Sequence, residues 1–237
     1  MLITGISKKG GRSVNEDSYG ETRAKGILCA VTADGLGGLS GGSIASKLAV
    51  ETVMKEFLAS PAISHDAIKG YIHAANNAIE EAAATDPEHV HMATTIVVLL
   101  RKGKCAIWAN VGDSRLYRFK NNMIEEVTED HSLAFMDFVN GNIEYNDIRT
   151  STDQNKLTNA LGSSMGEISV YENHSVSTDT SFLLCTDGWW EHVTEDDMEK
   201  TLKSSSSPRS WIQQMLDIRE KAAPENSDNY TAVAVMI

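Results

Sequence analysis

Residues 93–127 read ATTIVVLLRKGKCAIWANVGDSRLYRFKNNMIEEV. Runs rich in β-branched residues alternate here with short polar segments at Arg101–Lys104 and Lys120–Asn122, which is typical of strands joined by turns. Connections this short join antiparallel neighbours, so the stretch predicts two β-hairpins. Val97–Leu100 is apolar at every position, which predicts a strand that is covered on both faces.

The rest of the chain adds further strands and three long helices to these hairpins. The same pattern predicts strands at Ile27–Ala33, Thr94–Leu100, Ala106–Val111, Arg115–Phe119, Ser181–Thr186 and Thr231–Ile237. Apolar residues at helical spacing predict helices over Ser43–Leu58 and His65–Ala84, and a last helix with the apolar stripe Trp211, Met215, Ile218 and Ala222. Strands grouped in hairpins, with helices between and after them, predict an α+β fold in which helices cover antiparallel sheets.

Length, charge and cysteine usage limit the class of protein. The 237 residues contain no segment that looks like a linker, so we expect one domain spanning 1–237. A formal net charge of −12, with no basic cluster, argues against nucleic acid as a partner. No stretch has the length of a membrane span or the character of a signal peptide. We expect a cytoplasmic protein with reduced cysteines and no membrane partner, and a monomer.

Four aspartates stand where an apolar run meets a polar turn: Asp34, Asp113, Asp187 and Asp228. Asp34 and Asp187 each precede a glycine, and for either pair alone an ordinary Asp-Gly turn would be the simpler interpretation. Four such strand ends favour a shared site, because converging carboxylates repel one another unless a cation holds them. The pattern therefore predicts a metal site.

An ion held by these residues would have oxygen ligands only. Cysteine and histidine lack zinc-type spacing, so the candidate ions are Mg²⁺ and Mn²⁺. The candidate ligands are the side chains of Asp17, Asp34, Asp113, Asp187 and Asp228, with backbone carbonyls. Two ions that share an aspartate can activate a water molecule for in-line attack on phosphorus. Arg12 is the candidate for binding phosphate oxygens; the alternative is a solvated surface arginine.

Eight short motifs follow one another along the chain. They are RSVNEDS (Arg12–Ser18), ADGLGG (Ala33–Gly38), ATT (Ala93–Thr95), NVGDSR (Asn110–Arg115), TEDHS (Thr128–Ser132), TNALG (Thr158–Gly162), CTDGW (Cys185–Trp189) and DNYT (Asp228–Thr231). In this order they resemble the metal-dependent (type 2C, PPM) protein serine/threonine phosphatases in their compact bacterial form. The resemblance implies a four-layer α-β-β-α sandwich of two antiparallel β-sheets flanked by pairs of helices.

The resemblance also implies a dinuclear Mn²⁺ or Mg²⁺ centre at one end of the sandwich. Asp34 would bridge the two ions, and Asp187 and Asp228 would complete the first. The second ion would be bound by the Gly35 carbonyl and by Asp17, directly or through water. Attack on the phosphate would then come from a hydroxide that bridges the ions.

Other positions have supporting roles by the same resemblance. Glu16 would share the role of Asp17, and Asn229 would lie just outside the ligands. Asp113, with Asp187, would hold a weaker third ion, and Arg12 would bind the phosphate. Leu36 stands where many relatives have a histidine proposed as the proton donor, so a water held at Asp113 is the hypothesis for that role.

The function implied is hydrolysis of phosphoserine and phosphothreonine on proteins. The expected partners are phosphorylated proteins, among them a bacterial serine/threonine kinase and the substrates of that kinase. The alternative is a catalytically weak relative that binds phosphoproteins as a scaffold, although no metal aspartate is missing. The polar segment at about 134–156 corresponds to a flap beside the metal centre, where sequence variation would affect substrate choice. His131, Trp189 and Trp190 are interpreted as structural, with Trp189 expected to be the more buried tryptophan.

Overall fold

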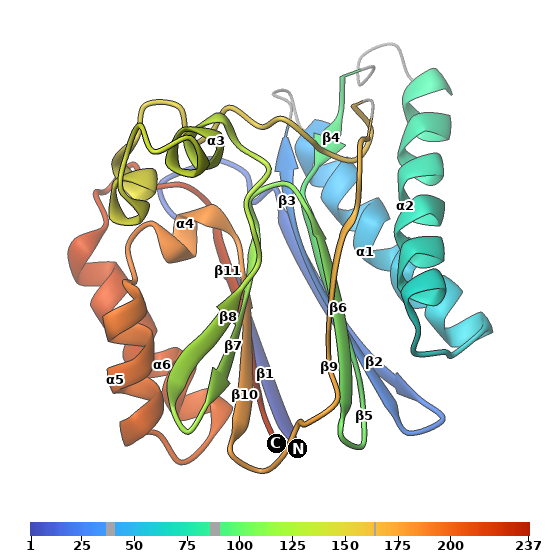
Figure 1. The fold of residues 1–237 in the computed structure, drawn as a ribbon. Helices are drawn as coiled ribbons and strands as arrows, with labels where there is room; N and C mark the ends of the chain where they lie inside the picture. The colour runs from blue at the N-terminus through green and yellow to red at the C-terminus, as the bar shows by residue number, and fades with distance from the viewer. Residues whose placement is uncertain (37–40, 86–90, 164) are drawn as a thin grey trace.

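Two antiparallel sheets face each other in the computed structural model, and a pair of helices covers the outer face of each (Figure 1). The structure describes residues 1–36, 41–85, 91–163 and 165–237. Gly37 and Gly38 of the predicted ADGLGG motif lie outside these ranges. The α+β sandwich expected from the sequence is confirmed, with four layers in the order α-β-β-α.

The first sheet has the strand order β1-β11-β10-β7-β8. Its strands are β1 (Leu2–Lys8), β11 (Tyr230–Met236), β10 (Thr180–Cys185), β7 (Arg115–Lys120) and β8 (Met123–Val127). The second sheet has the order β2-β3-β5-β6-β9. Its strands are β2 (Asp17–Ala24), β3 (Ile27–Leu36), β5 (Ile96–Lys102), β6 (Cys105–Val111) and β9 (Ser169–Asn173), with β4 (Ala93–Thr94) paired to the end of β3. Both predicted hairpins, β5-β6 and β7-β8, are antiparallel.

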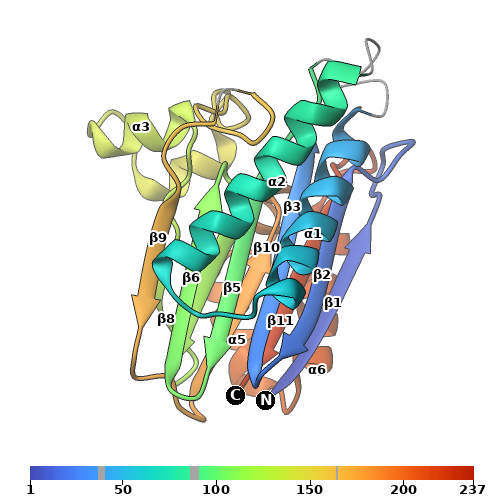
Figure 2. The same ribbon diagram turned by 90° about the vertical axis from the view of Figure 1, so that its right-hand side faces the viewer.

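Helices α1 (Gly41–Ala59) and α2 (His65–Thr85) cover the second sheet, and α5 (Glu195–Ser204) and α6 (Pro208–Ala222) cover the first (Figures 1 and 2). The short helix α4 (Asp187–Trp190) directly follows β10. Helix α3 (Leu133–Val139) and the 3-10 helix η1 (Tyr145–Thr150) lie beyond one end of the sandwich, within the predicted flap (Figure 1). Among the described residues, no helix is both long enough and apolar enough to cross a membrane.

Apolar side chains fill the space between the sheets as well as the space under the helices. Leu28, Leu99, Trp108, Phe182 and Val233 belong to the layer between the two sheets and are almost completely buried. Because alternate residues of the same strands point to the helices, the central strands are apolar on both faces. Burial of each such side chain contributes roughly 1.5–3 kcal/mol to folding.

Three features differ from the sequence predictions. Strands β1, β2 and β9 were not predicted; all are edge strands, and nearly all their residues are partly or fully exposed, so they lack the continuous apolar runs of the central strands. The strand predicted from Thr94 to Leu100 is interrupted at Thr95. In α6 the buried face contains Trp211 and Met215, as expected. Its further members are Leu216 and Arg219, whereas Ala222 is exposed.

Candidate metal centre

The predicted metal ligands come together at one end of the sandwich. Asp17 begins β2 and lies directly opposite Asp34, near the end of β3, in the antiparallel register. Asp187 opens α4 after β10, and Asp228 precedes β11, which is hydrogen-bonded alongside β10. A cavity of about 190 Å³ at this end is lined by Arg12, Glu16, Asp34, Gly35, Leu36, Asp113, Asn155, Leu157, Asp187 and Asp228. Strand ends thus place carboxylates from distant parts of the chain around one cavity.

The two glycines that follow the aspartates allow close contact between backbones. Gly35 lies within β3 and Gly188 within α4, so neither Asp-Gly pair forms a hairpin turn. A Cβ atom on Gly35 would lie 2.1 Å from the Gly42 carbonyl oxygen, and one on Gly188 would lie 2.1 Å from that of Asn229. Any larger residue would push apart the segments that carry the carboxylates.

The threonines of the ATT motif fix the backbone of Asp34. The Asp34 amide donates to Thr95 Oγ1 at 3.0 Å. The Asp34 carbonyl accepts from the Thr95 amide at 2.9 Å and from Thr94 Oγ1 at 2.8 Å. This bonding accounts for the interruption between β4 and β5, since Thr95 pairs with the metal-site aspartate instead of continuing the strand.

Arg12 and Asp228 form a bidentate ion pair at the cavity. Arg12 Nε donates to Asp228 Oδ1 at 3.0 Å and Nη2 donates to Oδ2 at 2.8 Å. The loop that carries Arg12 is fastened by Asn229, whose side-chain amide donates to the carbonyls of Lys9 and Val14 and accepts from the Glu16 amide. Residues near the two ends of the described chain therefore form one wall of this cavity together.

Burial and mutual repulsion make these carboxyl groups hard to ionise. Burial is the largest cause in each case: it raises the pKa of Asp17 to about 7 and holds the pKa values of Asp34 and Asp113 well above their usual range. The charge of Asp187 adds to both of the latter shifts, and the pKa of Asp187 is itself raised. A divalent cation would remove this repulsion.

The donor set fits a hard divalent cation. It consists of oxygen atoms only, and two of them, Glu16 Oε1 and Asp17 Oδ1, are buried without a hydrogen-bond partner in the structure. Among the described residues, no three His, Cys, Asp or Glu side chains are arranged to hold an ion as they stand. Asp228 is paired with Arg12, and Asp17 Oδ2 accepts from Thr186 Oγ1 at 2.8 Å. An ion that uses both carboxylates has to share or replace these partners.

We expect the melting temperature to fall with rising pH when divalent cations are chelated. A carboxyl group whose pKa is raised on folding stabilises the fold below its unfolded pKa, near 4, and this contribution is lost as the pH rises through the folded value, about 7 for Asp17. Thermal melts in EDTA between about pH 5 and pH 8.5 measure the fall, and Mn²⁺ should remove most of it. Asp17→Asn should give a flatter profile; a wild-type profile as flat as that of the variant would contradict the expectation.

Two residues that the sequence analysis did not select hold the site together. Thr186, which donates to Asp17, also accepts from the Thr231 amide at 3.0 Å and so ties β10 to β11. Arg219 is 2% exposed; its Nε donates to the Gly188 carbonyl at 2.7 Å and its Nη2 to the Asp228 carbonyl at 3.3 Å. The guanidinium carbon lies 3.3 Å from the centre of the Tyr230 ring. Helical spacing in the sequence could have identified Arg219 as buried, because it lies four residues after Met215 on the buried face of α6.

Arg219→Met should destabilise the protein and loosen the metal site. The variant loses charged hydrogen bonds to two carbonyls that position Asp187 and Asp228, a loss of about 2–4 kcal/mol in the free energy of unfolding. Urea unfolding and titration with Mn²⁺, followed by calorimetry, measure the two effects. The control is Arg209→Met on the exposed side of the same helix, which should match the wild type. Equal behaviour of the two variants would exclude the role given to Arg219.

Behind Asp113 lies a buried ion pair rather than a substrate-stacking surface. Trp189 and Trp190 were expected to differ in burial, with Trp189 the more buried. In the structure both side chains are buried to almost the same extent. Trp190 Nε1 donates to the Asp113 carbonyl at 3.0 Å, and its ring centre lies 3.7 Å from the guanidinium carbon of Arg115. Arg115 in turn donates to both oxygens of Asp130, at 2.8 and 2.6 Å.

His131 contacts structural groups outside the metal cavity. Its Nδ1 accepts from the Gly112 amide at 3.3 Å, and its Nε2 lies 2.9 Å from Ser169 Oγ. Burial lowers the pKa of His131, which favours the neutral ring. The ring thus joins the loop before Asp113 to the end of β9.

Comparison with known proteins gives the same family by sequence and by fold. A family profile described as protein phosphatase 2C matches residues 4–227. The serine/threonine phosphatase stp of Listeria welshimeri is 33% identical over 203 residues, which cover 83% of this chain and 80% of that protein. Serine/threonine phosphatase Stp1 from Staphylococcus aureus superposes with a TM-score of 0.88 at 25% identity, over 100% of this chain and 95% of the other. The catalytic domain of the phosphatase PstP, solved in complex with 2 manganese ions, superposes with a TM-score of 0.84 at 22% identity, over 98% of this chain and 96% of the other.

Proposed function

Because the chain belongs to the protein phosphatase 2C family of bacterial protein serine/threonine phosphatases, we propose that it hydrolyses phosphoserine and phosphothreonine on proteins in opposition to a serine/threonine kinase. The observation that carries the proposal is the convergence of Asp34, Asp113, Asp187 and Asp228 with Arg12 around one cavity. A scaffold that only bound phosphoproteins would gain nothing from keeping so many repelling carboxylates together.

We assign the cation ligands residue by residue. Asp34 would be the shared ligand of two Mn²⁺ or Mg²⁺ ions, because the charges of Asp17, Asp113 and Asp187 all act on its carboxyl group. Asp187 and Asp228 would hold the first ion; Asp17 and the Gly35 carbonyl would hold the second, with Glu16 beside them. Asp113 and Asp187 would serve a third, weaker position. The two manganese ions in the structure of PstP support this choice of cation.

The ions, when bound, supply a hydroxide nucleophile at neutral pH and positive charge for the developing phosphate anion. Arg12 binds the phosphate group of the substrate. Asp228 occupies Nε and Nη2 of the guanidinium, so donors on Nη1 remain for phosphate oxygens. Since Asp228 also fixes the plane of the guanidinium, Arg12 presents these donors in one orientation. The Asn229 contacts keep the loop that carries Arg12 at a constant distance from Asp228.

The test of this function is phosphate release from peptides in the presence of Mn²⁺. A phosphothreonine peptide should be hydrolysed, a matched phosphotyrosine peptide much more slowly, and EDTA should stop both reactions. Arg12→Lys should raise KM and lower kcat, because a lysine cannot hold two oxygens in one plane. Absence of Mn²⁺-dependent phosphate release from the wild type, together with retained binding of the phosphopeptide, would favour the scaffold alternative.

A further inference from the structure

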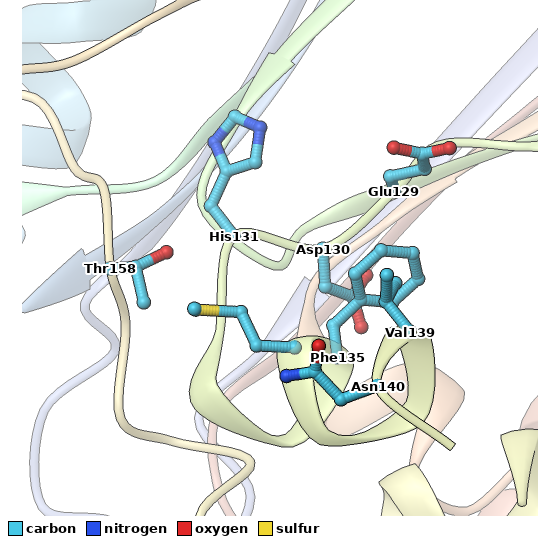
Figure 3. Close-up of a pocket in the computed structure, with 8 residues that line it drawn as sticks. Glu129, Asp130, His131, Phe135, Val139, Asn140 and Thr158 are labelled. Atoms are coloured by element: carbon cyan, nitrogen blue, oxygen red, sulfur yellow. The ribbon is translucent and has the colours of Figure 1, made fainter.

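A second cavity of about 300 Å³ lies beside helix α3 (Figure 3). It is lined by Glu129, Asp130, His131, Phe135, Met136, Val139, Asn140 and Thr158, none of which is a proposed metal ligand. Figure 3 shows Thr158 on one side of this cavity and Phe135, Val139 and Asn140 on the opposite side. We refer to it as the α3 cavity.

The α3 cavity is a close neighbour of the metal centre. Leu157 lines the metal-centre cavity, and the next residue, Thr158, lines the α3 cavity. The segment is extended at this point: Leu157 pairs with Ser132 in an antiparallel bridge, and the Leu133 amide donates to the Lys156 carbonyl at 2.9 Å. Two adjacent residues of one segment therefore line the two cavities, so the cavities lie side by side.

The side chains around the α3 cavity combine an apolar wall with an acidic rim. Met136 and Val139 are 51% and 67% exposed, which is high for apolar residues on a short helix. The carboxylate of Asp130 is neutralised by Arg115, whereas Glu129 is exposed. Glu129 lines the cavity, and Glu129 and Glu167 both act electrostatically on His131, so the charge on this side of the opening is negative.

We infer that the α3 cavity binds an apolar side chain of the phosphoprotein substrate, flanked by a lysine or arginine and lying about three residues from the phosphorylated residue. The inference rests on the proposed function. An extended peptide advances about 3.3 Å per residue, so three residues span about 10 Å, which is the scale of a step from one cavity to its neighbour. The acidic rim selects a basic flank, and the net charge of −12 disfavours a second copy of this chain as the occupant.

Matched phosphothreonine peptides test this subsite. Each pair carries either leucine or serine next to a lysine, three residues before or three residues after the phosphothreonine. For one of the two placements, kcat/KM of the wild type should be about tenfold higher with leucine, because an apolar side chain enters an apolar pocket. The double variant Met136→Ser, Val139→Ser should lose this preference and keep the wild-type rate on the small substrate p-nitrophenyl phosphate. Met123→Ser, at an exposed apolar residue of β8, is the control and should keep the preference.

The outcomes separate this inference from the proposed function. Hydrolysis of all peptides at equal rates, or a preference that survives in the double variant, overturns the subsite and leaves the phosphatase assignment intact. Absence of hydrolysis of both the peptides and p-nitrophenyl phosphate overturns the proposed function and the subsite with it. Replacing the peptide lysine with glutamine should lower kcat/KM for the wild type and have little effect for Glu129→Gln.

Discussion

Asp34→Asn is expected to abolish phosphopeptide hydrolysis, with kcat falling by about 10³-fold or more. As the proposed shared ligand, Asp34 contributes to both ions of the dinuclear centre, and losing several kcal/mol of transition-state stabilisation corresponds to a factor of this size. The substitution keeps the shape of the side chain, and the bonds from Thr94 and Thr95 to the Asp34 backbone are untouched. Steady-state rates on a phosphothreonine peptide with Mn²⁺ measure the loss.

The same variant should be more stable than the wild type when cations are chelated. Repulsion from Asp187, Asp17 and Asp113 acts on the Asp34 carboxylate, and a neutral amide removes it. Melting temperatures in EDTA near pH 8 should therefore rise, whereas Mn²⁺ should stabilise the variant less than the wild type. Asp196→Asn, at an exposed residue of α5, is the matched control. A variant that retained activity within tenfold, or melted below the wild type in EDTA, would refute the role assigned to Asp34.

Asp130→Asn is expected to produce the largest loss of stability, about 3–5 kcal/mol in the free energy of unfolding. The side chains of Arg115 and Asp130 are 2% and 1% exposed, so the substitution removes the buried counter-charge of the guanidinium. The remaining carboxylate, that of Glu195, is 3.7 Å from Nη1 and 25% exposed. Contact with the Trp190 ring compensates only in part. Urea unfolding, monitored by tryptophan fluorescence, measures the loss.

A double-mutant cycle gives this prediction its control. Replacing both partners, as in Arg115→Met, Asp130→Leu, should recover a large part of the stability, because no buried charge is then left alone. Removing the exposed pair Asp196–Lys200 should change the stability little, since both groups are mostly in solvent. A loss below 1 kcal/mol for Asp130→Asn would show that the buried pair is compensated by its other neighbours.

The central strands could be predicted from the sequence, whereas of the edge strands only β8 could, through the short turn that joins it to β7. Strands β3, β5, β6, β10 and β11 are buried on both faces, so they read as continuous apolar runs. Strand β2 has only alternate residues turned inward and carries charge on the others, a pattern that polar loops share. The stripe predicted for the last helix was shifted because Arg219, a charged residue, occupies a buried position where Ile218 had been expected.

The meeting of the aspartates at one cavity could be predicted because the position of each aspartate, at the end of an apolar run, is visible in the sequence by itself. Aspartates at the ends of apolar runs do meet at one cavity, and the structure adds the paired glycines that permit it. Thr186 and Arg219 were missed because their importance lies in partners that are close only in the fold. Their residue types alone, a threonine after a strand and an arginine in a helix, are compatible with many structural roles.

The position of β11 has a consequence for how the protein is made. This strand is the last element of the chain, yet it lies inside the first sheet, between β1 and β10. A nascent chain cannot complete that sheet until residues 228–236 have left the ribosome, because β1 has no other neighbour in it. Asp228 and its contact with Arg12, 216 positions away in sequence, also form only at that moment. Chains that lack β11 therefore lack both the complete first sheet and the candidate metal site.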